Sequence, residues 1–110
     1  MEDCGVGKGF SLRLIEVPGY GVMAALADLE ELGRVEEDRE RGLRLEVSPA
    51  FYSGRVVCGE EARRILSMAT ILVLAGRRII GMAVEMGLVN PDSILEVNGL
   101  PHVQVYKFRF

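Results

Sequence analysis

The feature that most constrains the fold is a run of apolar residues from Ile65 to Ala75. The run stops at Gly76-Arg77-Arg78, so it is shorter than the ~18 residues that a membrane-spanning helix needs. Apolar residues recur through it and just before it at helical spacing: Ala62, Ile65, Leu66, Ala69, Leu72 and Val73. Because Met68, Ile71 and Leu74 extend the apolar surface around most of the circumference, we predict a central helix covered on both flanks.

Alternating apolar and polar residues predict strands before and after this helix. We expect these strands at residues 10–17, 22–27, 42–47, 94–97 and 103–108, and a short extended piece at 55–57. A second helix is expected over residues 77–86, with Gly87 ending it, and a single helical turn over 29–32 with Asp28 as its N-cap. This order predicts an α+β two-layer sandwich, with two helices packed on one face of a mainly antiparallel sheet of about five strands.

The 110 residues fit one domain, which we place at residues 10–110. Residues 1–9 hold three glycines and little apolar surface, and we expect them to form a flexible, dispensable tail. Charge is uneven: residues 1–49 carry six basic and eleven acidic groups, whereas residues 50–110 carry seven and five. The acidic loop expected at residues 36–41 disfavours coating by nucleic acid but leaves room for a local basic face in the second half.

The cysteines and the basic residues bear on the compartment and the habitat. Cys4 and Cys58 are too few for a disulfide framework and fit a reducing compartment, and no secretory signal is visible, so we expect a cytoplasmic protein. Cys58, three residues before Glu61, occupies the position of a helix cap. Eleven arginines against two lysines, with few amide side chains, resemble a thermophile's composition.

Several segments together carry a likeness to a known family. They are Leu43 to Val47, Phe51 to Gly54, Ala69 to Gly76, Gly87 to Val89, and Gly99-Leu100-Pro101-His102-Val103-Gln104. Their order and spacing resemble the archaeal domain-of-unknown-function 424 family over about residues 10–105. The resemblance implies an archaeal single-domain α+β protein with no assigned activity, and association with RNA or translation is a hypothesis within that family. Ala27 stands where relatives often have a cysteine, which argues against thiol chemistry there.

Two groups of residues are candidates for a binding site. Tyr52, if it points outward beside Arg55, would stack on a base and contact its phosphate; the alternative is that it seals the core. His102, the only histidine, is expected in a turn between strands, where it either locks the turn structurally or contacts a ligand together with Asn98 and Gln104.

We therefore expect a non-catalytic binding module whose hypothesised partner is RNA or a translation-associated protein. The alternatives are a small enzyme that uses His102 and Asp28 as an acid–base pair, and a structural homodimer in which the strand at residues 103–108 pairs with its copy. No cofactor, metal or membrane association is expected, because one histidine and two distant cysteines do not make up a zinc ligand set.

Overall fold

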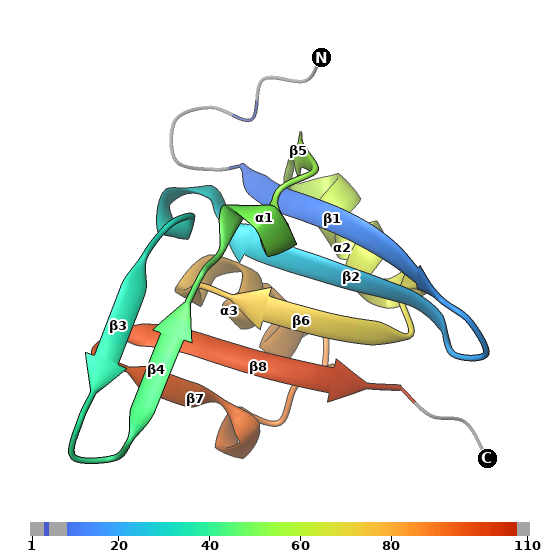
Figure 1. The fold of residues 1–110 in the computed structure, drawn as a ribbon. Coiled ribbons are helices and arrows are strands. Elements are labelled where there is room, and N and C mark those ends of the chain that lie inside the picture. Colours follow the sequence, from blue (N-terminus) through green and yellow to red (C-terminus); the bar gives the residue numbers. More distant parts are fainter. Residues whose placement is uncertain (1–3, 5–8, 108–110) are drawn as a thin grey trace.

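The fold is built on a six-stranded sheet with the order β5-β1-β2-β6-β8-β7 (Figure 1). The computed structural model describes Cys4 and residues 9–107. Neighbouring strands are antiparallel except for the parallel pair β2 and β6. The strands are β1 (Phe10–Val17), β2 (Gly21–Asp28), β5 (Arg55–Val57), β6 (Ile71–Ala75), β7 (Leu95–Val97) and β8 (Leu100–Tyr106).

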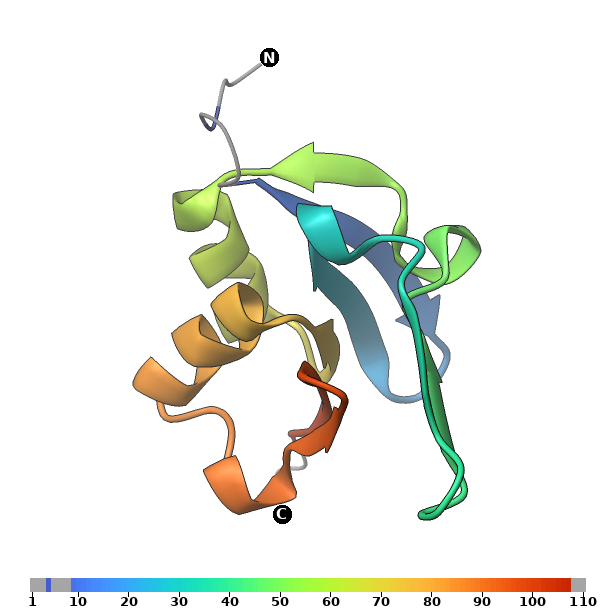
Figure 2. The same ribbon diagram turned by 90° about the vertical axis from the view of Figure 1, so that its left-hand side faces the viewer.

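The two faces of the sheet are covered differently. Helices α2 (Gly59–Met68) and α3 (Arg77–Glu85) lie together on one face (Figure 2). The other face carries a hairpin of β3 (Val35–Asp38) and β4 (Leu43–Glu46), followed by the short helix α1 (Pro49–Tyr52). Two 3-10 turns, η1 (Leu29–Glu31) and η2 (Pro91–Ser93), complete the described elements. The α+β class is confirmed, but the sheet has six strands, and the hairpin with α1 adds a partial third layer.

The largest correction concerns the predicted central helix. Helix α2 ends at Met68, and the rest of the apolar run forms strand β6. Leu72 and Leu74 pack against the helices, while Val73 and Ala75 pack against the layer on the other face. A strand that is buried on both faces loses its polar alternation, so its sequence does not differ from that of a buried helix.

Two predicted loops are also regular structure. The acidic loop begins as strand β3, and the turn at residues 50–54 contains α1. In β3, Glu37 pairs with Arg44 across the hairpin at 3.4 Å, and Asp38 pairs with Arg41 at 3.6 Å. Arginines of the hairpin therefore pair with the carboxylates of β3, which offsets the repulsion expected of an acidic segment.

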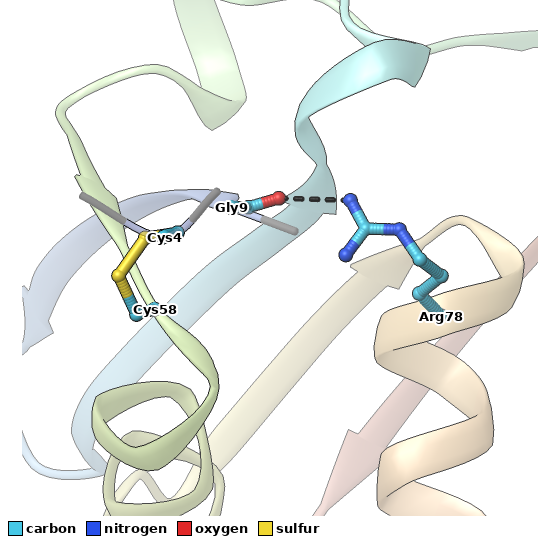
Figure 3. Close-up of a disulfide and its surroundings, with 4 residues drawn as sticks. All are labelled: Cys4, Gly9, Cys58 and Arg78. Carbon is cyan, nitrogen blue, oxygen red and sulfur yellow. Dashed lines mark hydrogen bonds between the residues drawn. A yellow bond between two sulfur atoms is a disulfide. The ribbon is translucent and has the colours of Figure 1, made fainter. Parts of the chain in front are cut away.

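The cysteines form a disulfide, contrary to the prediction that they fit a reducing compartment. Cys4 is bonded to Cys58 across 54 positions of sequence, with their Cα atoms 5.2 Å apart. Cys58 is the residue before α2, as predicted, but its side chain makes no capping hydrogen bond. Figure 3 shows the second attachment of this region, from the Arg78 guanidinium to the Gly9 carbonyl at 2.9 Å. The predicted tail at residues 1–9 lies outside the described residues except for Cys4 and Gly9, both of which are attached to the domain.

Candidate functional site

The sheet face that carries the hairpin is covered over only part of its area. In Figure 1 the hairpin and α1 lie over the left-hand part of this face, and no described element lies in front of the right-hand ends of the strands. Strand register brings five side chains together there, which we call the open half-face: Ile15, Met23, Ile71, Gln104 and Tyr106. Tyr106 is 53% exposed, and its hydroxyl donates to Gln104 Oε1 at 3.2 Å. Ile71 is buried, Ile15 and Met23 are partly buried, and Gln104 and Tyr106 are exposed. The open half-face is thus largely apolar, with an amide and a phenol at one edge.

Small side chains explain why the other half is sealed. Ala25, Ala27 and Ala75 lie in adjacent strands on this face and are fully buried or nearly so. Because alanine is short, the layer above approaches closely and packs Val47 and Tyr52 against them.

Tyr52 belongs to this sealed half. It is 3% exposed, and burial raises the pKa of its phenol to about 12. Its carbonyl accepts a 2.5 Å hydrogen bond from the buried Ser11 hydroxyl, which fixes α1 on β1. Arg55 lies in the edge strand β5 and pairs with Glu61 at 2.6 Å. The interpretation of Tyr52 as an outward stacking residue is therefore wrong, and the alternative, an aromatic that seals the core, is what the structure shows.

His102 lies within β8 rather than in a turn. It faces the same side as Leu100 and Gln104, two residues away in each direction, and pairs with Ala75 on one side and Leu95 on the other. The side chain is half-buried, and burial lowers its pKa, so the imidazole is neutral at neutral pH. Among the described residues the imidazole has no hydrogen-bond partner in the structure. His102 and Gln104 are thus brought together, with His102 at the border between the two halves of the face.

Asp28 lies on the opposite face of the sheet, where its side chain caps α3. It is 2% exposed, its Oδ2 accepts from the Arg78 amide and its Oδ1 from the Ile79 amide, each at 2.8 Å. Burial raises the pKa of this carboxyl, while the two amide bonds and the Arg78 charge act in the other direction. Asp28 therefore caps α3 rather than the 3-10 turn that follows it. Because Asp28 and His102 point to opposite faces, the proposed acid–base pair is not formed.

Arg78, which was not predicted as a site residue, organises the surroundings of Asp28. Its guanidinium pairs with Glu30 through bonds of 2.6 and 2.8 Å and lies 4.6 Å from the centre of the Phe10 ring. Gly76, at a φ of 114°, brings the chain against Asp28, where a Cβ atom would overlap the carboxylate. In the sequence, this network is indicated by Gly76 and the arginines after it, which end the apolar run.

Asn98 ties the hairpin to the sheet. It adopts a left-handed φ of 49° in the turn between β7 and β8. Its side-chain amide donates to the Glu37 carbonyl at 2.9 Å and to Glu36 Oε1 at 3.3 Å, and its own carbonyl accepts from Arg34 at 2.9 Å. Asn98 is therefore a structural residue, because these bonds fix the position of β3.

The described cations are mostly paired with carboxylates. Ion pairs engage the side chains of Arg34, Arg39, Arg41, Arg44, Arg55, Arg63, Arg77 and Arg78. Across the part of the chain that the structure describes, no group of three or more histidine, cysteine or acidic residues is arranged to hold a metal ion. No helix among those residues is long and apolar enough to cross a membrane.

Comparison with known proteins places the chain in a family. A crystal structure of an uncharacterised conserved protein from Methanopyrus kandleri is similar to it, with a TM-score of 0.69 and 27% sequence identity over 93% of this chain and 94% of that one. No curated protein matches the chain. The family model described as protein of unknown function (DUF424) matches residues 15–108. Since this match spans most of the sequence and the predicted resemblance had pointed to the same family, the chain belongs to the DUF424 family of proteins of unknown function.

Proposed function

We propose that this protein is a non-catalytic binding module whose contact surface is the open half-face. The observation that carries the proposal is the unequal covering of one sheet face: one half is sealed by the hairpin and α1, whereas Tyr106 and Gln104 on the other half are exposed. Around them lie the apolar side chains of Ile15 and Met23, which are only partly buried. A partly exposed apolar surface with polar groups at its edge is typical of a site where another molecule docks.

The chemistry of the open half-face favours a protein as the partner. Tyrosine, methionine and isoleucine contribute apolar area, and none of the five residues is charged. Recognition of RNA depends on cations that neutralise phosphates. Arg13, which lies on the same face of β1 as Ile15, donates to the Ala50 carbonyl, and Arg55 is paired with Glu61. A translation-associated protein remains within this proposal, and RNA is the competing result of the experiment.

The test uses the full chain as bait in an extract of its native cell type, with captured protein and RNA both identified. We expect Tyr106→Ala to reduce capture of the partner at least about tenfold, as for an aromatic contact worth ~1.4 kcal/mol or more. The matched control is Val56→Ala, because Val56 is 56% exposed but lies in β5, outside the open half-face. Equal loss in both variants, or capture that is abolished by ribonuclease, contradicts the proposal.

A second candidate is a homodimer through β8, as the sequence analysis considered. Strand β7 pairs only with Leu100 to His102, so the outer edge of β8 from Val103 to Val105 has no strand partner among the described residues. An unpaired edge can add a strand from a second copy. Light scattering across a concentration series separates the two candidates, since dimerisation doubles the mass and a monomer at all concentrations excludes it.

The disulfide bears on the proposed cytoplasmic location. Disulfides are rare in the cytosol of most organisms, but intracellular proteins of hyperthermophilic archaea commonly contain them. A thermophilic source, proposed above from the arginine-rich composition, makes the disulfide and a cytoplasmic location compatible.

A further inference from the structure

The disulfide lies on the wall of an open surface hollow, away from the open half-face. The hollow has a volume of about 380 Å³ and is lined by Cys4, Phe10, Cys58, Gly59, Arg78 and Met82. Both cysteines are partly exposed. Exposed disulfides are the ones that thiols reduce most readily, so the partial exposure of this bond makes it a candidate for exchange.

The two sulfur atoms have different surroundings. Cys58 directly precedes the ten-residue helix α2, whose first-turn amides have no side-chain cap. Amide groups at a helix N-terminus stabilise a thiolate at this position. Two carboxylates in the first turn act against this effect, but one of them, Glu61, is paired with Arg55. Cys4 lies outside any helix, so the Cys58 sulfur is the better leaving group of the two.

We propose that the Cys4–Cys58 disulfide is a thiol-exchange site that a small thiol opens at the Cys4 sulfur. The incoming thiolate forms a bond to Cys4 Sγ, the Cys4–Cys58 bond breaks, and its electron pair leaves on Cys58 Sγ as a thiolate. A second thiolate then attacks the incoming sulfur of the mixed disulfide, and Cys4 leaves as a thiolate that takes up a proton. Two thiols are oxidised to one disulfide, and the protein disulfide is reduced to two thiols.

The neighbouring contacts limit what the exchange changes. The Gly9 carbonyl is held by Arg78, independently of the disulfide, so the start of β1 stays in place when the bond opens (Figure 3). The Cys4 sulfur packs beside Gly9 and forms part of the wall of the hollow. Cys4 shares this wall with Phe10 and Met82, so reduction alters the apolar wall of the hollow and leaves the strands of the sheet in place. This site is independent of the proposed function.

The direction of exchange is tested on the oxidised full chain with reduced glutathione, without denaturant. Samples are trapped with iodoacetamide after short times and mapped by peptide mass spectrometry. We expect glutathione on Cys4 and the carbamidomethyl group on Cys58, in roughly tenfold excess over the reverse arrangement. The reverse or an equal distribution overturns the proposal, as does the absence of any reaction in the folded protein.

Two further measurements separate exchange in the folded protein from exchange after unfolding. Glu60→Gln removes a negative charge in the first turn of α2 that opposes the Cys58 thiolate, so it should speed exchange about threefold. Glu85→Gln is the same change at the end of α3, and it should leave the exchange rate unchanged. Equal rates in both variants contradict the proposed role of Cys58. The rate should also be insensitive to low urea, and a rate that rises with urea as steeply as global unfolding shows that the site is not open in the native protein.

Discussion

Removal of the disulfide should lower stability substantially, although it attaches a segment that the sequence predicts to be dispensable. The bond joins residues 54 positions apart, and the chain-entropy relation gives a loss of unfolded-state entropy of about 14 cal/mol/K for such a loop. At 25 °C this corresponds to about 4 kcal/mol. The value is a ceiling, because an unfolded chain without the bond keeps residual structure.

The effect is large enough to measure by thermal unfolding. For a domain of this size 1 kcal/mol shifts the Tm by ~4 °C, so the double variant Cys4→Ser with Cys58→Ser should melt roughly 10 to 15 °C below the oxidised protein. Reduction of the wild type by dithiothreitol, or deletion of residues 1–9, should give a similar decrease. A decrease under about 3 °C in calorimetry refutes the reasoning and supports the dispensable tail.

Other predictions concern the cap of α3 and the imidazole. Asp28→Asn leaves one acceptor oxygen where two backbone amides donate. It should lower the free energy of unfolding, measured by urea denaturation, by about 1–2 kcal/mol. An unchanged value contradicts the capping role. Gly76→Ala should cost about 2 kcal/mol or more, from its positive φ and the overlap with the carboxylate, and a wild-type Tm would show that this contact is relaxed. Because burial lowers the pKa of His102, the unfolded chain takes up a proton near its ordinary value of 6.5 before the folded chain does. Stability should therefore fall as the pH drops below 6.5 and level off below the folded-state pKa, and His102→Gln should remove this slope in urea titrations.

The sequence by itself determined those elements whose residues face one covered side and one solvent side. Strand β1 spans the predicted residues 10–17, because its outer end alternates between exposed and partly buried positions and the strand lies between a glycine and a proline turn. Helix α3 was predicted within one residue, since its buried face of Ile79, Ile80 and Ala83 has helical spacing and Gly87 follows it at a φ of 75°. The family could also be predicted from the sequence, because a family is identified from the order of its motifs and not from contacts in the fold.

Only the tertiary structure decided the features that depend on what covers each residue. Ile71–Ala75 is a strand because layers on both sides bury it, and no local pattern distinguishes that from a buried helix. Tyr52 turns inward because alanines in β2 and β6 leave space beneath it. Asp28 and His102 were plausible partners by residue type, but sheet register and the pleat place them on opposite faces. The Cys4–Cys58 bond joins residues 54 positions apart. No local pattern in the sequence predicts this pairing, because the packing of the whole domain brings the two cysteines together.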